Sequence, residues 1–111
     1  MEIWKDIPEY EGRYQASNLG NIRSVDRIRS NGTGHYLQKG KVMKPALSSN
    51  KYMSLFLYMN TGKSFLLHRL IALCFCENPL NKQFVNHKDG NKLNNNADNL
   101  EWCSRQENVD H

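Results

Sequence analysis

The sequence of 111 residues predicts an α+β fold, with N-terminal β-hairpins and a short helix packed on a C-terminal ββα unit. Three patterns carry this prediction. Apolar residues alternate along 52–59, which is typical of a strand with one buried face. Along 67–76 the apolar period changes to that of a helix. The segment 84–111 then shows a strand at 84–86, a turn, a second strand at 99–103 and the start of a helix. The length fits one domain.

The N-terminal part predicts a β-hairpin followed by an exposed loop. Strand candidates 14–16 and 22–25 flank a turn at 18–21, whose sequence NLGN is rich in turn-forming residues. The segment 29–40 holds three glycines and few apolar residues. We therefore expect an exposed loop there that is mobile until it meets a binding partner.

The middle of the chain predicts two strands and then a helix. The strands are expected at 42–47 and 52–59, and Asn78-Pro79 ends the helix because proline disfavours helical backbone before it. We expect this helix to be the apolar backing of the C-terminal unit. Its predicted buried face consists of Leu67, Leu70, Ile71, Cys74 and Phe75.

The charge pattern favours a polyanionic partner without requiring one. The net charge is +4, and six basic residues against one acidic residue lie between positions 21 and 44. Such side chains could neutralise the phosphates of a duplex, or they could form an ordinary solvated face. The candidates for nucleic-acid binding are Arg23, Arg27, Arg29, Lys39, Lys41, Lys44 and, beside the C-terminal unit, Arg105.

The three cysteines argue against a disulfide framework and against a structural zinc site. Cys74, Cys76 and Cys103 form no CxxC pair, and their number is odd. We expect buried thiols and a cytoplasmic protein. No signal peptide or bilayer-spanning segment is visible, so no membrane partner is expected.

The C-terminal unit gathers imidazole and amide groups. Ser104 and Glu107 have the spacing of a capping box, which predicts a helix that begins at Ser104. Asn108 and His111 would then share one face of that helix. A hairpin followed by a helix can bring this face against His87, directly after the first strand.

These residues resemble a known family. The order His87, Asn99, Asn108 and His111, with the words VNHKDGNKLNN and NLEW, is similar to that of HNH endonucleases of the ββα-metal type, phage and intron-encoded homing enzymes in particular. The opening WKDIPEYEGRYQASNLGNIRSV resembles the NUMOD4-like motif of those enzymes. The likeness implies a DNA-contacting region at 1–60 and a nuclease region at 61–111. It also implies that the protein acts on double-stranded DNA as a monomer or weak homodimer, in a bacterial or phage-infected cell.

The resemblance also implies a role for each residue of the site. His87 would be the general base, and Asn99 would hydrogen-bond the loop backbone and orient His87. Asn86 and Asn108 would hold one Mg²⁺ or Mn²⁺ per active site. His111 would be a further ligand or a phosphate contact. His68, in LHRLIA, is expected to have a packing or hydrogen-bonding role.

Position 86 departs from the pattern of the closest relatives, where an aspartate is common. An amide oxygen ligates a hard cation but brings no charge, so we expect Asn86 to hold metal well only when DNA adds phosphate oxygens. This departure leaves two functions open. One is a metal-dependent DNA endonuclease, and the other is a DNA-binding module of the same fold with weak or lost catalysis.

Overall fold

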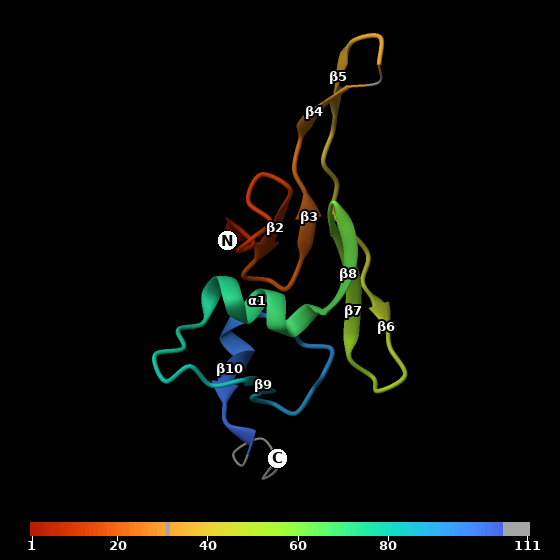
Figure 1. Cartoon of the computed structure of the whole chain (residues 1–111). Coiled ribbons are helices and arrows are strands. Elements are labelled where there is room, and N and C mark those ends of the chain that lie inside the picture. The colour runs from red at the N-terminus through yellow and green to blue at the C-terminus, as the bar shows by residue number, and fades with distance from the viewer. Residues whose placement is uncertain (31, 106–111) are drawn as a thin grey trace.

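The computed structural model describes residues 1–30 and 32–105, and these residues form four small antiparallel sheets around one α-helix (Figure 1). The first sheet contains β1 (Trp4–Asp6), β2 (Tyr14–Ser17) and β3 (Ile22–Ser24). The hairpin β4 (Arg27–Ser30) and β5 (His35–Gln38) follows. The third sheet contains β6 (Ala46–Leu47), β7 (Met53–Met59) and β8 (Thr61–Leu66). Helix α1 (Leu67–Phe75) leads to a ribbon of β9 (Phe84–His87) and β10 (Leu100–Cys103), with the 3-10 helix η1 (Ala97–Asn99) between them. The α+β class is confirmed.

Helix α1 lies at the centre of the fold and contacts strands of three sheets. Its apolar stripe predicts this position: Leu70 and Ile71 are 1% and 0% exposed. The helix contacts β2 of the first sheet, β7 and β8 of the third, and both strands of the C-terminal ribbon. Leu73, on the opposite face, is 49% exposed. The predicted apolar backing is therefore present, and it serves the N-terminal sheets as well as the C-terminal unit.

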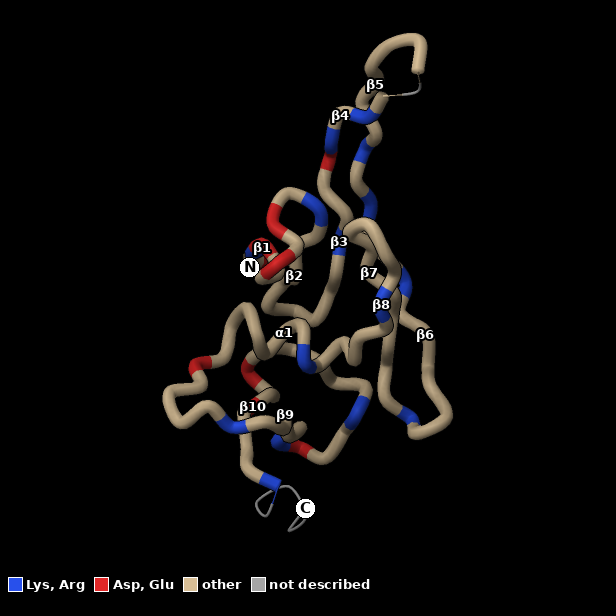
Figure 2. Tube along the Cα trace, viewed as in Figure 1, with Lys and Arg blue, Asp and Glu red and all other residues tan. Residues whose placement is uncertain are grey.

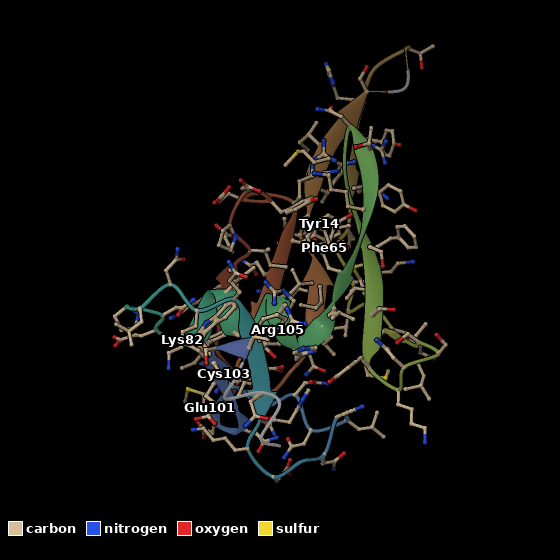
Figure 3. All side chains as sticks on the ribbon, turned by 60° about the horizontal axis from the view of Figure 1, so that its bottom comes forward. Tyr14, Phe65, Lys82, Glu101, Cys103 and Arg105 are labelled. Atoms are coloured by element: carbon tan, nitrogen blue, oxygen red, sulfur yellow. The ribbon has the colours of Figure 1, made fainter. Side chains whose placement is uncertain are left out.

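Aromatic side chains join the first sheet to the third. Tyr10 contacts Tyr14 and Phe65 edge to face, with ring centroids 5.8 and 5.7 Å apart. Figure 3 shows Tyr14 and Phe65 together at this junction. The hydroxyl of Tyr14 also accepts a hydrogen bond of 3.1 Å from the backbone N–H of Tyr58. The two regions divided by the sequence analysis thus share one core.

The segment 29–40 is exposed, as predicted, but the irregular loop conformation predicted for it is wrong. Strands β4 and β5 pair from Arg27 with Gln38 to Ser30 with His35, so residues 29–30 and 35–38 of the segment belong to a two-stranded ribbon. This arm projects from the body at one end of a molecule that measures 57 × 29 × 25 Å (Figure 1). Its side chains are almost all exposed. Alternating burial, the usual sequence signal of a strand, cannot appear in such a ribbon.

Two other boundaries differ from the sequence prediction. The strand expected at 42–47 is reduced to Ala46–Leu47 and an isolated bridge between Arg23 and Val42. Val42 pairs with β3 of the first sheet and Ala46–Leu47 pair with β7 of the third, so this stretch crosses from one sheet to the other and does not form one strand. Pro45, between them, has no N–H group to donate to a ladder. The second C-terminal strand begins at Leu100 rather than residue 99, because Ala97–Asn99 form a 3-10 turn.

Most of the helix expected after Ser104 lies outside the described residues, as do Glu107, Asn108 and His111. Within residues 1–30 and 32–105, no helix has the length and apolar character needed to cross a bilayer.

Replacing Ile71 with alanine should destabilise the whole domain. The side chain is 0% exposed, and truncating such a residue typically lowers the free energy of unfolding by about 2–5 kcal/mol. Urea denaturation followed by circular dichroism measures the change. Leu73→Ala, on the exposed face of the same helix, should cost less than about 1 kcal/mol. Equal losses in the two variants would contradict the central position of α1.

Candidate active site

The ribbon of β9 and β10 places His87 inside the protein. His87 pairs with Leu100 across the ribbon, and Asn86 pairs with Glu101. The side chains of Val85, Asn86 and His87 are all buried, so strand β9 does not alternate between a wet and a dry face. One face of β9 packs on α1, and the loop 88–96 folds over the end of the strand. Strand β9 therefore holds His87 among fixed neighbours of the fold.

The imidazole of His87 is held by Asn95. The ring atom Nε2 lies 2.8 Å from Oδ1 of Asn95, and the Asn95 side chain is 7% exposed. Because a carbonyl oxygen accepts and cannot donate, Nε2 carries the ring proton in the neutral imidazole. Nδ1 is left as the basic nitrogen. The sequence analysis missed Asn95, since one asparagine in the run Asn94-Asn95-Asn96 has no pattern that separates it from its neighbours.

A stack of rings fixes the other side of His87. The ring of His68, from α1, lies 4.9 Å from that of His87, and Tyr52 stacks on His68 at 4.9 Å. The ammonium of Lys92 sits 4.5 Å from the centroid of Tyr52. Burial, with smaller effects from His87 and Arg69, lowers the pKa of His68 to about 4. His68 is therefore neutral at physiological pH, and it packs against His87 without adding a positive charge.

Asn99 braces the loop and does not touch the His87 ring. Its Oδ1 accepts a hydrogen bond from the backbone N–H of Asp89 at 3.1 Å. Its Nδ2 donates to the carboxylate of Asp89 and to the backbone carbonyl of Asn94, both at 2.9 Å. Hydrogen bonds from Asn94, Asn91 and Asn99 lower the pKa of the Asp89 carboxyl. Any orienting effect of Asn99 on His87 passes through this loop, whereas Asn95 contacts the ring directly.

Asn86 is oriented by the strand opposite. Its Nδ2 donates a hydrogen bond of 3.1 Å to the carboxylate of Glu101, which lies at the outer edge of the ribbon (Figure 3). This bond fixes which end of the amide is the oxygen and leaves Oδ1 available to a cation. Within the described residues no three histidine, cysteine or acidic side chains gather in a metal-binding group. The amide oxygen of Asn86 suits Mg²⁺ or Mn²⁺ better than Zn²⁺, and it needs further oxygen ligands.

These side chains border an open hollow of about 440 Å³. Its lining includes Tyr52, Asn86, His87, Asp89 and Lys92. A phosphodiester in this hollow would meet the imidazole, the amide and an ammonium group together. The predicted ligands Asn108 and His111 belong to the part of the chain that is not described.

A second hollow, of about 450 Å³, is lined by residues at the base of the arm and is strongly basic. Figure 2 shows the Lys and Arg positions, in blue, along β4 and β5 and below them. Desolvation and the neighbouring guanidinium groups of Arg13 and Arg29 lower the pKa of Arg27. Such crowding of like charges is relieved when a polyanion binds. The basic residues that line this hollow are Arg13, Arg27, Arg29, Lys39 and Lys41.

The structure separates the predicted DNA-binding residues into two groups. Four of them line the basic hollow, where Arg13, which the sequence analysis did not select, joins them. Arg23 instead donates to Oε1 of Gln15 at 2.9 and 2.6 Å and covers the ring of Trp4. Lys44 and Arg105 are exposed and lie outside the hollow.

Comparison with known proteins agrees with this geometry. One family model, the NUMOD4 motif, matches residues 2–58, and a second, HNH endonuclease, matches residues 65–110. The chain carries a NUMOD4 motif, and its residues 65–110 are an HNH endonuclease domain. The resemblance seen in the sequence is confirmed. HNH endonucleases generally use a divalent metal ion.

Relatives of this HNH protein include viral proteins, and the chain spans about half or less of their length. The DNA endonuclease I-HmuI of Bacillus phage SP01 is 39% identical over 108 residues, which cover 96% of this chain and 55% of that protein. The uncharacterized HNH endonuclease L245 of Acanthamoeba polyphaga mimivirus is also 39% identical, with 97% of this chain and 29% of that protein covered. A solved structure of DNA binding and cleavage by the HNH homing endonuclease I-HmuI matches with a TM-score of 0.79 and 38% identity. That match covers 97% of this chain and 56% of the solved chain.

The stability of this HNH fold should fall as the pH drops from about 6.5 to about 4, and His68 should cause part of the fall. The folded pKa of His68 lies near 4, below the ordinary value of 6.5, so the unfolded chain binds the extra proton in this window. One such proton costs at most about 1.4 kcal/mol per pH unit. Urea denaturation across the window should show a shallower fall for His68→Phe, which keeps an aromatic ring without a titrating group. Identical slopes in wild type and variant would contradict the buried, neutral state of His68.

Proposed function

We propose that this chain is a metal-dependent DNA endonuclease that hydrolyses phosphodiester bonds. The observation that carries the proposal is the pair His87 and Asn95. A buried imidazole whose Nε2 is occupied by an amide oxygen, and which borders an open hollow, has the state required of a general base. The likeness to I-HmuI, which binds and cleaves DNA, supports the same conclusion.

In the proposed reaction, Nδ1 of His87 removes a proton from a water molecule. The oxygen of that water attacks the phosphorus, and the bond to the 3′ oxygen breaks. The 3′ oxygen takes up a proton from solvent, giving 5′-phosphate and 3′-hydroxyl ends. Asn95 keeps the ring in the tautomer that can accept the proton, and it also bonds the imidazolium that forms. The stack of Tyr52 and His68 prevents the ring from turning away.

The metal proposed is one Mg²⁺ or Mn²⁺ ion, held by Asn86 together with Asn108 and phosphate oxygens of the DNA. When bound, the ion neutralises charge on the phosphate and on the leaving oxygen. Asn86 is suited to this role because Glu101 holds its Nδ2 and leaves Oδ1 free. The Glu101 carboxylate also adds a negative charge close to the neutral amide. His111 is proposed as a further ligand or a phosphate contact.

The basic arm is proposed to hold the duplex. A two-stranded ribbon has the width to enter a major groove, and the hollow at its base collects five basic side chains. The longest dimension of the protein, 57 Å, corresponds to about 17 base pairs at 3.4 Å each. Double-stranded DNA is therefore the proposed partner, with contacts at the arm and cleavage at the other end. Arg23, Lys44 and Arg105 are proposed as peripheral phosphate contacts.

One observation favours a second function. Position 86 is an amide, and Asp89, the one carboxylate among the described residues that line the hollow, accepts hydrogen bonds from Asn94 and Asn99 of its own loop. A DNA-binding module that has weak or lost catalysis would have the same arm and the same fold.

His87→Ala should lower the rate of nicking of a supercoiled plasmid in Mg²⁺ or Mn²⁺ by about 10²- to 10⁴-fold, because His87 is the one histidine that the described part of the chain contributes to the lining of the hollow. The carboxylate of Asp89, which also lines it, accepts hydrogen bonds from Asn94 and Asn99 of its own loop. The affinity for duplex DNA in EDTA should remain within about twofold, since the change leaves the arm intact. Gel electrophoresis and fluorescence anisotropy measure the two quantities. Equal cleavage by both proteins would remove His87 from the mechanism.

The same assay separates the two functions. If the wild-type chain binds DNA but does not cut it with any divalent ion, the binding module is the correct reading. Asn86→Asp should then restore cutting, because a carboxylate supplies the missing charge.

Arg27→Gln and Lys39→Gln should each weaken DNA binding and lower the salt dependence. Each lost phosphate contact should reduce the slope of log K against log salt by about 1. Fluorescence anisotropy at several salt concentrations gives the slope. Lys5→Gln is the matched control, since its ammonium lies on the ring of Phe75, away from the arm. A slope that changes as much in the control as in the arm variants would show that only net charge matters.

A further inference from the structure

The turn of the N-terminal motif at residues 17–21 lies against the loop that carries Asn95. The backbone N–H of Ala97 donates a hydrogen bond of 2.8 Å to the carbonyl oxygen of Asn18. Gly20 faces the backbone of Asn95 so closely that the glycine has no room for a side chain. These contacts join segments that are more than seventy residues apart in the sequence, and they lie at the opposite end of β2 and β3 from the arm (Figure 1).

The turn is rigid. Ser17 is 0% exposed, and its hydroxyl oxygen accepts hydrogen bonds from the backbone N–H groups of Leu19 and Asn21. The side-chain oxygen of Asn18 accepts a hydrogen bond of 2.7 Å from the backbone N–H of Ile3. Backbone bonds from Ser17 to Asn21 and from Gly20 to Ser17 close the turn. A turn held by these hydrogen bonds can fix the position of the 95–97 segment that packs on it.

The close approach requires glycine at position 20. A Cβ atom there would lie 2.8 Å from the carbonyl oxygen of Asn95 and 3.2 Å from its Cβ. The φ angle of Gly20 is +91°, which side-chain-bearing residues rarely adopt. The steric constraint on position 20 comes from Asn95 alone, whereas the positive φ angle comes from the turn.

We propose that the turn 17–21 is a positioning element for the catalytic histidine and acts through Asn95. Gly20 and the carbonyl of Asn18 fix the backbone of the 95–97 segment, and the side chain of Asn95 then fixes the tautomer and orientation of His87. This inference rests on the proposed endonuclease function. It assigns to the NUMOD4 motif a part in the chemistry, in addition to DNA contact.

The proposal predicts a specific defect in Gly20→Ala. The new methyl group pushes Asn95 away from His87, so the rate of single-turnover cleavage should fall about 10- to 100-fold, as expected for a misplacement of around 1 Å. The dissociation constant for duplex DNA in EDTA should stay within about twofold. Gly12→Ala is the matched control. Gly12 has a similar φ of +80° but nothing within 4 Å of an added Cβ, so this variant carries the backbone strain without the collision.

A second variant breaks the contact without adding bulk. Ala97 is the first residue of η1, where proline is tolerated, and Asn96 before it has φ −60° and ψ 139°, which suits a residue that precedes proline. Ala97→Pro therefore removes the N–H that binds Asn18 while keeping the local backbone. It should reproduce the rate loss of Gly20→Ala. If Gly20→Ala does not fold, the cleavage rate of Ala97→Pro tests the positioning role of the turn.

A double-mutant cycle tests whether the effect passes through Asn95. Asn95→Ala alone should slow cleavage by a similar factor, and adding Gly20→Ala to it should cost less than about a further twofold, because the two changes disrupt one interaction. Multiplying losses would show that Gly20 acts by another route and would overturn the proposal.

Nitrogen NMR of the His87 imidazole gives a readout that needs neither metal nor DNA. The wild type and Gly12→Ala should show a hydrogen-bonded, slowly exchanging Nε2–H proton in the neutral ring. Gly20→Ala and Ala97→Pro should lose that signal or show a mixture of tautomers. Unchanged signals, or a loss of DNA affinity with an unchanged cleavage rate, would overturn the positioning role. A wild-type protein that never cleaves DNA would overturn the proposed function instead, and the NMR signal would still decide whether the turn positions His87.

Discussion

The burial of one helical stripe holds this protein together. None of the four sheets has more than three strands among the described residues, and sheets of that size are marginal in water unless a face is covered. Helix α1 covers them: Leu67, Leu70 and Ile71 are almost inaccessible to solvent, and they pack against strands that come before and after the helix in the chain. The same helix carries His68 on its first turn. The element that supplies the core therefore also fixes one wall of the candidate active site.

That wall brings the imidazole rings of His68 and His87 close together, where a positive charge on both rings would be unfavourable. Two histidines with ring centroids 4.9 Å apart cannot both be charged at low cost in a buried site. The pKa of His68 falls to about 4, and burial is the main cause. A neutral ring can then lie beside His87 without repelling a proton that His87 receives. An arginine or lysine in the place of His68 would lose this property.

More of the fold than of the candidate active site could be predicted from the sequence. Alternation along β7 and the helical period of α1 are local patterns, and both elements formed where the patterns placed them. His87 and Asn99 belong to the motifs VNHKDGNKLNN and NLEW, so both could be selected as site residues from the sequence. The partner of the His87 ring could not, because it depends on the path of loop 88–96 and not on spacing. The arm was hidden for another reason: a ribbon exposed on both faces has no buried side to alternate.

The elongated shape has a consequence for how such a protein would measure DNA. The arm and strand β9, which carries His87, lie toward opposite ends of the molecule, and the sheets between them share one core with α1. If the arm contacts DNA as proposed, this separation would set the number of base pairs between the bases that the arm touches and the scission point. The arm could then change its preferred sequence through surface substitutions while the offset to the cut stayed the same.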